Sequence, residues 1–147
     1  MIHFHPLRVK KIEKETEDGV SIVFDVPNEL QDLFRFKQGQ SLTVRKQFNG
    51  DEARRTYSIC SAPTDKILRV AVKKVGGGVF STWANDQLKA GDVIDVMPPV
   101  GKFYTELNPV QSKNYMAFAA GSGITPVLSI IKTTLLTEPN SSFTLVY

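Results

Sequence analysis

Apolar residues alternate with other residues along the first two-thirds of the chain, and turn residues interrupt this alternation at short intervals. The clearest segment carries apolar side chains at every second position from Val20 to Val26. Because successive side chains of a strand point to opposite faces, this alternation predicts a strand with one buried face. Several short strands at this spacing predict a small antiparallel barrel or sandwich. Similar segments occur at 42–44, 68–72 and 93–97, with turn residues at Gly39, Asn49-Gly50, Ala62-Pro63 and Gly91-Asp92.

Two short helical segments are expected beside these strands. Residues 27–34 are too few and too polar for a central strand, and we expect them to form a helical turn that plugs one end of the barrel. After Gly76-Gly77-Gly78, the apolar spacing from Val79 to Leu88 predicts a short helix.

A different pattern begins near Asn108-Pro109. It predicts a strand over 114–119, a helix over 125–136 and a strand over 142–147. Thr125 is placed as the N-cap of that helix, and Pro126 suits its first turn because a proline needs no N–H partner there. The chain therefore begins a parallel βαβ unit near its end.

The extended segment Arg55-Thr56-Tyr57-Ser58 offers a cation, an aromatic face and a hydroxyl within four residues. A guanidinium can form two charge-assisted hydrogen bonds with a pyrophosphate, and a phenol ring can stack on a flavin. In a strand, Arg55 and Tyr57 line the same face. The alternative is an ordinary edge strand with a salt-bridged arginine and a half-buried tyrosine.

The glycine loop at 76–78 is a second candidate for binding phosphate. Free N–H groups and the positive end of the helix dipole meet at the start of a helix, and glycine allows a phosphate to approach the backbone. Ser81 adds a hydroxyl donor. The alternative is a flexible loop before a capping helix whose Phe80 and Trp83 only fill the core.

Composition excludes several classes of protein. The formal net charge is +3 and the basic residues are scattered, which does not favour a nucleic-acid partner. Cys60 is the only cysteine, so an intrachain disulfide and a thiolate cluster are excluded, and a reducing compartment is expected. The sequence lacks a bilayer-spanning apolar run and a signal-peptide pattern, which predicts a cytoplasmic protein without a membrane partner. His3 and His5 have no third ligand near them in sequence, and no metal site is expected.

Four motifs follow one another along the chain. They are Arg55-Thr56-Tyr57-Ser58, Gly78-Val79-Phe80-Ser81, Pro99-Val100-Gly101-Lys102-Phe103 and Gly121-Ser122-Gly123-Ile124-Thr125-Pro126. Their order resembles the ferredoxin–NADP reductase-like flavoproteins, and within this family the chain looks most similar to the reductases of bacterial ring-oxidising monooxygenases that act on phenylacetyl-coenzyme A.

The resemblance implies a mainly β chain with two parts. Residues 1–109 are expected to form a six-stranded, Greek-key antiparallel barrel that binds FAD. Residues 110–147 are expected to form the first βαβ portion of a parallel α/β domain that binds NAD(P). A full-length reductase of this kind would transfer electrons from NAD(P)H to the flavin. The flavin would then pass them to an iron–sulfur centre and an oxygenase, or to a ferredoxin.

The resemblance also assigns roles to residues. Arg55 would contact the flavin pyrophosphate, Tyr57 would pack on the ring, and Ser58 would lie near N5. The backbone of Val72 and Lys73 would meet the pyrimidine edge of the ring, and residues 78–81 would hold the pyrophosphate. Ser58 and Thr125 are the candidates nearest the reacting atoms. The complete expected set is Arg55, Thr56, Tyr57, Ser58, Val72, Lys73, Gly78, Val79, Phe80 and Ser81 for the flavin, with Gly121, Gly123 and Thr125 at the nicotinamide.

One departure from the family concerns the iron–sulfur cluster. A plant-type cluster needs four cysteines, and the sequence has only Cys60. We therefore expect a truncated chain that lacks the cluster domain and has weak or absent NAD(P)H turnover on its own. Exposed apolar surface on the second part predicts dimerisation or domain swapping.

Two other functions remain open from the sequence. One is a barrel without redox activity that binds a phosphate ligand or a protein. The other is a flavin protein that acts as a regulatory sensor.

Overall fold

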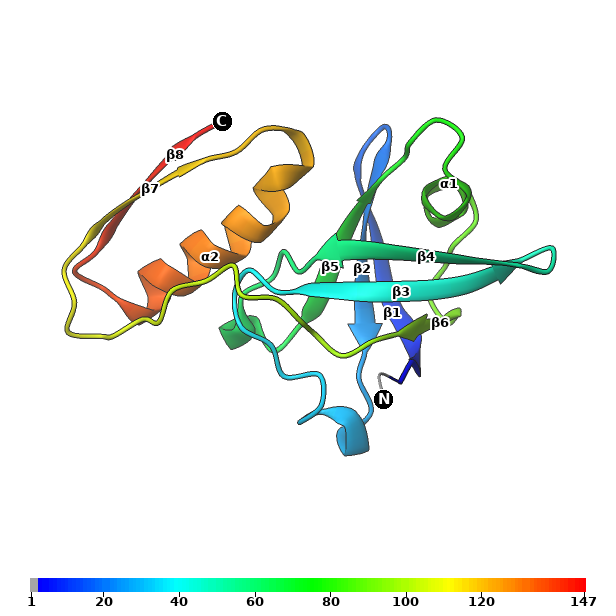
Figure 1. Ribbon diagram of the computed structural model, residues 1–147, viewed down its shortest axis with the longest axis horizontal. Coiled ribbons are helices and arrows are strands. Elements are labelled where there is room, and N and C mark those ends of the chain that lie inside the picture. The colour runs from blue at the N-terminus through cyan, green and yellow to red at the C-terminus, as the bar shows by residue number, and fades with distance from the viewer. Residues whose placement is uncertain (1–2) are drawn as a thin grey trace.

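The computed structural model describes residues 3–147, and six of its strands pair antiparallel in one sheet (Figure 1). They are β1 (His5–Thr16), β2 (Gly19–Asp25), β3 (Ser41–Phe48), β4 (Asp51–Ser58), β5 (Leu68–Lys73) and β6 (Val93–Val96). The order across the sheet is β4-β3-β6-β1-β2-β5, so β6 lies between the two hairpins β1–β2 and β3–β4. The predicted antiparallel architecture is confirmed, and its strand order joins segments far apart in sequence.

The two edge strands of this sheet, β4 and β5, meet at one end only. An isolated antiparallel bridge pairs Ile59 with Val70, and the Cys60 N–H donates to the Arg69 carbonyl at 3.0 Å. Continuing this register would place Tyr57 opposite Val72, but no ladder forms there between the described residues. The strands therefore leave an open seam beyond the bridge.

Helix α1 (Val79–Asp86) packs at this seam and contacts both edge strands. It begins directly after Gly78, as the apolar spacing predicted. Its buried face carries Phe80, which is fully enclosed, and Ala84. The helix thus fills part of the space that a β4–β5 ladder would otherwise close.

Strand β2 is buried on both faces, so the expectation of a single buried face was incomplete. Ser21 and Val23, which alternate with the predicted core residues, are also buried. Ser21 Oγ donates to Glu15 at 2.7 Å. Val23 lies between Lys11 and Arg69 of the neighbouring strands, whose aliphatic stems can cover an apolar side chain.

The expected helical turn after β2 is present as the 3-10 helix η1 (Asn28–Leu30), followed by a turn. Phe34 closes this segment and is buried in the core beside the ring of His5, with 5.9 Å between ring centroids. A second 3-10 helix, η2 (Pro63–Asp65), follows β4. Both turns lie at the end of the barrel where β2 finishes and β5 begins.

The predicted βαβ unit forms a separate two-stranded parallel sheet (Figure 1). Strand β7 (Asn114–Phe118) leads through the 3-10 helix η3 (Gly121–Gly123) to α2 (Ile124–Thr137), and β8 (Ser142–Val146) follows. The N-cap of α2 is Gly123, not Thr125 as predicted. The η3 turn brings the helix start forward, so Thr125 lies in the first turn and its hydroxyl donates to the Ser122 carbonyl at 2.9 Å.

Helix α2 is attached to the barrel through η2. The buried hydroxyl of Ser129 donates to the carbonyl of Ser61 at 2.7 Å, and Lys132 pairs with Asp65 at 2.5 Å. These contacts hold the βαβ unit against the barrel. Among residues 3–147, no helix is long and apolar enough to cross a membrane.

Candidate functional site

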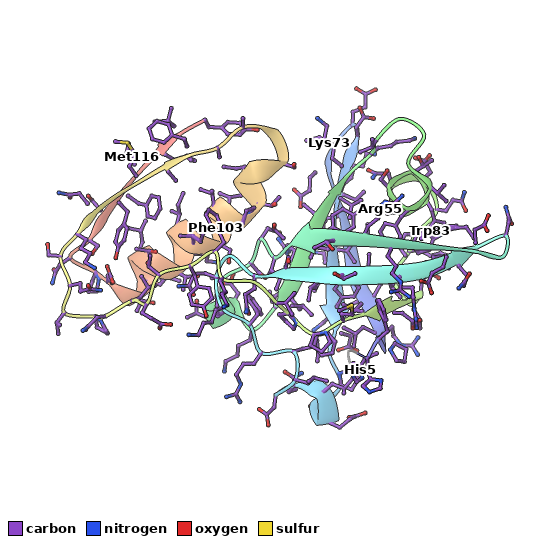
Figure 2. All side chains as sticks on the ribbon, viewed as in Figure 1. His5, Arg55, Lys73, Trp83, Phe103 and Met116 are labelled. Carbon is purple, nitrogen blue, oxygen red and sulfur yellow. The ribbon has the colours of Figure 1, made fainter. Side chains whose placement is uncertain are left out.

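A hollow of about 350 Å³ opens at the seam between β4 and β5, and we call it the Arg55 hollow. Arg55 and Lys73 lie on these two strands near α1 (Figure 2). The hollow is lined by Arg55, Thr56, Tyr57, Lys73, Val75, Gly76, Gly77, Gly78 and Ser81. The structure therefore brings the arginine motif and the glycine loop, which are about twenty residues apart in sequence, to one site.

Strand β4 directs Arg55 and Tyr57 to the same face, as alternation requires. They lie opposite Val44 and Leu42 of β3. The side chain of Arg55 is exposed, and its Nη1 donates to the Arg54 carbonyl at 2.6 Å. Since a guanidinium has five N–H donors, most of them remain free to hold an anion.

Tyr57 is half-buried, and its ring rests on the fully buried ring of Phe80 in α1, with 5.8 Å between centroids. Burial raises the pKa of Tyr57, and the nearby Arg55 partly offsets that effect. The phenol is therefore neutral at physiological pH. A neutral ring held from behind by Phe80 is suited to stacking on a flat ligand.

The glycine loop leaves room for a group to approach its backbone. A Cβ added at Gly76 or Gly77 would meet no atom within 4 Å, and Gly77 has a φ of +74°, which L side chains rarely adopt. Within residues 3–147, no side chain forms a capping hydrogen bond at the start of α1. The N–H groups at the helix start are therefore available to an anion.

Ser81 does not offer its hydroxyl to the hollow in the way its position in the sequence indicated. Its Oγ accepts from the Val75 N–H at 3.1 Å and donates to the Gly78 carbonyl at 3.3 Å. The side chain therefore holds the loop in shape, although it also borders the hollow.

The residues lining the hollow give it a positive potential. Arg55 and Lys73 both line it, and none of the described lining residues is acidic. The next lysine, Lys74, is paired with both carboxylate oxygens of Asp86, at 2.9 and 2.7 Å. Asp86 is therefore engaged by Lys74 and does not offset the two cations.

Several residues predicted for the site lie outside the lining. Val72 and Phe80 are fully buried core side chains, Val79 is half exposed, and Ser58 is half-buried at the end of β4. The nicotinamide candidates Gly121, Gly123 and Thr125 lie in the βαβ unit. Their roles remain predictions.

Sequence reasoning missed two members of this site. Val75 borders the hollow without a motif of its own, and Asn85 supports it from α1. The asparagine gives no local signal, because its partner on β5 is thirteen residues away.

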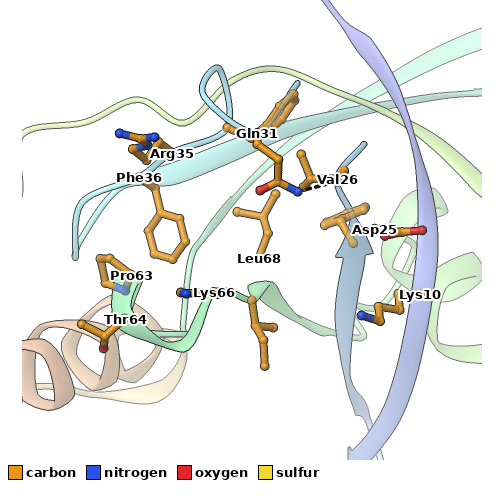
Figure 3. A pocket seen from close by; sticks show the side chains of 13 residues that line it. Lys10, Asp25, Val26, Gln31, Arg35, Phe36, Pro63, Thr64, Lys66 and Leu68 are labelled. Carbon is orange, nitrogen blue, oxygen red and sulfur yellow. Dashed lines mark hydrogen bonds between the residues drawn. The ribbon is translucent and has the colours of Figure 1, made fainter. Parts of the chain in front are cut away.

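A larger cavity of about 600 Å³ lies at the other end of β5, between η1 and η2 (Figure 3). Phe24, Phe34 and Leu68 form its buried floor. Lys10, Arg35, Lys66 and Asp25 are the charged residues of its described lining, and Arg35 is paired with Asp32 at 2.6 Å. Its size is that of a ligand site, but its described lining contains none of the predicted site residues and no glycine loop.

The Arg55 hollow fits the phosphate part of a flavin nucleotide. It supplies a forked cation, an open glycine loop at a helix start and an aromatic face beside them. It does not fit a metal, and the described residues contain no cluster of three or more metal-ligating side chains.

Comparisons with known proteins agree with this chemistry. Residues 6–104 match the family described as the oxidoreductase FAD-binding domain. The chain is 48% identical over 147 residues to one component of the 1,2-phenylacetyl-CoA epoxidase of Escherichia coli (strain K12), and the match covers 100% of this chain and 41% of that protein. It is 41% identical over 144 residues to the ferredoxin reductase component of the 3-ketosteroid-9-alpha-monooxygenase of Rhodococcus rhodochrous, and that match covers 96% and 40%.

A similar solved structure is that of phthalate dioxygenase reductase, described as a modular structure for electron transfer from pyridine nucleotides to [2Fe–2S]. The TM-score is 0.76 at 32% sequence identity, and the match covers 97% of this chain and 42% of that one. The chain thus spans about two-fifths of the length of the relatives that it matches.

Proposed function

The chain belongs to the family of oxidoreductase FAD-binding domains, and from this we propose that it is the flavin-holding part of an electron-transfer reductase that serves an oxygenase. The observation that carries the proposal is the Arg55 hollow, where a guanidinium, an aromatic face and a glycine loop meet at the open seam of the barrel. When bound, FAD would accept two electrons together and release them one at a time.

The residues of this chain would bind and orient the flavin. Arg55 would hold the pyrophosphate through its free guanidinium donors, and the backbone of 76–78 would approach the same group. Tyr57 would present the ring face opposite the one that rests on Phe80. The exposed ammonium of Lys73 would lie near the ring edge and favour negative charge there.

The remaining assignments are part of the same proposal. Ser58 and Thr125 would lie nearest the reacting atoms, and Gly121 and Gly123 would admit the nicotinamide of NADH or NADPH. The barrel would extend over 1–109 and the nucleotide-binding part over 110–147. The parallel strand β7 and the turn at its carboxyl end match the usual position of such a site.

The partners are inferred from the relatives' names. An iron–sulfur centre, in a ferredoxin or a further domain, would receive the electrons and transfer them to an oxygenase, with phenylacetyl-coenzyme A as the leading substrate class. We place the protein in the cytoplasm, which cell fractionation can test. Exposed apolar side chains at Met116, Phe118 and Leu136 favour self-association through the βαβ unit, which light scattering can test.

The direct test is titration of the purified chain with FAD, followed by quenching of flavin fluorescence. We expect tight binding, visible absorption bands and a Kd raised about 10-fold or more by Arg55→Ala, since hydrogen bonds to charged groups are among the strongest. Arg54→Ala is the matched control. Its side chain pairs with Glu52 and does not line the hollow, so its Kd should stay at the wild-type value.

Two results would contradict the proposal. A colourless protein that does not take up FAD would favour a non-redox barrel that binds another phosphate ligand or a protein. Equal losses of affinity in Arg55→Ala and Arg54→Ala would place the flavin elsewhere.

A further inference from the structure

Asn85 connects the two sides of the Arg55 hollow without lining it. Its amide Nδ2 donates to the Val72 carbonyl of β5 at 3.1 Å and to the Ser81 carbonyl of α1 at 2.9 Å. Val72 immediately precedes Lys73, and Ser81 lies one turn back in the helix, so one NH₂ group ties the end of a barrel strand to the helix that starts at the glycine loop.

The identity of the side chain at this position is strictly constrained. Both partners of Asn85 are backbone carbonyls, so the bridging group must donate twice. Its own Oδ1 is buried and has no hydrogen-bond partner among the described residues. A buried amide with an unpaired oxygen carries a cost, which indicates that the two donated bonds are what the position requires.

Other contacts fix the two ends of the glycine loop but leave its middle free. The Lys74 N–H donates to the Asp18 carbonyl at 2.7 Å, and Ser81 bonds Val75 and Gly78 as described above. Gly76 and Gly77 have open space beside them. Hydrogen bonds therefore hold both ends of the glycine loop, and Asn85 connects the helix that follows the loop to β5.

We propose that Asn85 is a positioning residue that sets the glycine loop against the Val72–Lys73 strand end. This inference rests on the proposed function, in which the loop holds the flavin phosphates and the strand end borders the flavin ring. A flavin dinucleotide must satisfy both parts at once, so their relative placement determines how well it binds and how its ring is held.

The test uses the whole chain and two variants of Asn85. Asn85→Leu keeps the volume and removes both donors, whereas Asn85→Gln keeps both donors on a stem one methylene longer. We expect the FAD Kd to rise about 10-fold or more in Asn85→Leu and by a smaller factor in Asn85→Gln. The visible absorption bands of bound FAD should shift in the same order, because they report the surroundings of the ring.

A matched control separates positioning from general stability. Tyr115→Phe removes one hydrogen bond in the βαβ unit and should lower the melting temperature without changing the FAD Kd or spectrum. Wild-type Kd and spectrum in Asn85→Leu would overturn the inference. If circular dichroism shows that Asn85→Leu is unfolded, a third variant, Asn85→Ala, which also removes both donors but adds no apolar branch, decides, and an unchanged Kd and spectrum there would overturn the inference.

Failure of the proposed function gives a different result. In that case the wild-type chain itself would not bind FAD. Binding by the wild type with unchanged variants would reject only the role of Asn85.

Discussion

Glu138 accepts a hydrogen bond from the phenol of Tyr115 at 2.9 Å, which joins the end of α2 to strand β7. The carboxylate is fully enclosed and accepts three more bonds, from the Asn108 N–H, the Gln111 amide and the Ser141 hydroxyl. One buried side chain thus holds together the linker from the barrel, strand β7, the end of α2 and the turn that leads into β8.

This arrangement predicts a stability that depends on pH. Burial by itself raises the pKa of Glu138, but the four donors more than offset it, and the pKa lies below its ordinary value of 4.5. A carboxyl whose pKa is lowered on folding contributes stability above its unfolded pKa and loses it as pH falls through the folded pKa. We expect the melting temperature to fall below pH 4.5, and less steeply in Glu138→Gln, which should melt lower than wild type at pH 7.

The control for this prediction is Glu106→Gln, which removes an exposed ion pair with Lys37. That variant should follow the wild-type pH profile closely. Identical profiles for Glu138→Gln and the wild type would show that Glu138 is not the titrating group.

Alanine substitutions at Gly77 and Gly76 should differ in their effect on the stability of the protein, but both should weaken ligand binding. Alanine at Gly77 must adopt a φ of +74°, which costs about 1 kcal/mol, whereas no positive φ is required at Gly76. Both added methyl groups would occupy the open space beside the loop. Urea unfolding should therefore separate the two variants, while FAD titration should show weaker binding in both. Equal unfolding midpoints would contradict the strain argument.

Phe80 supports Tyr57 from within the core. Phe80→Ala should lower the free energy of unfolding by about 3–5 kcal/mol, because the ring is fully buried and its removal leaves a cavity. It should also weaken FAD binding through the loosened Tyr57 ring. Phe80→Leu retains most of the volume and should cost less on both measurements. Unaltered FAD binding in a folded Phe80→Ala chain would mean that Tyr57 needs no support.

Attachment of α2 to the barrel should depend on a buried bond more than on an exposed one. Ser129→Ala leaves the Ser61 carbonyl without its donor and should cost about 1–3 kcal/mol. Lys132→Ala removes the neighbouring ion pair with Asp65, whose lysine is half exposed, and should cost less than about 1 kcal/mol. Chemical unfolding of the two variants tests this order, and a reversed order would contradict it.

Local patterns predicted much of this fold. Alternation located β2, β3, β5 and β6, and the turn residues separated them, because both signals depend on neighbouring residues. The burial of Val23 was not predicted, since it depends on side chains of two other strands. The N-cap of α2 was misplaced by two residues because the η3 turn continues into the helix.

In the candidate site, too, the residues with a local chemical signal could be predicted, and those that depend on distant partners could not. Arg55, Tyr57 and Gly78 could be chosen from their chemistry, and the fold places them around one hollow. Asn85 and Glu138 could not, because each acts through partners that only the folded chain brings near. Glu138 in particular stands before a proline and reads as the end of a helix, although it is among the most buried side chains of the protein.

Because the seam between β4 and β5 is open, the fraction of the protein that stays folded should depend on the concentration of the ligand that binds there. Backbone edges that do not pair with each other leave the barrel less secured there than a closed one. A molecule that binds only the folded chain at this seam adds about 1.4 kcal/mol to its stability for each tenfold rise in free concentration above Kd. If the ligand is FAD, as proposed, a shortage of flavin would leave more of the chain unfolded and expose it to proteolysis, so the supply of cofactor would set how much of the protein a cell retains.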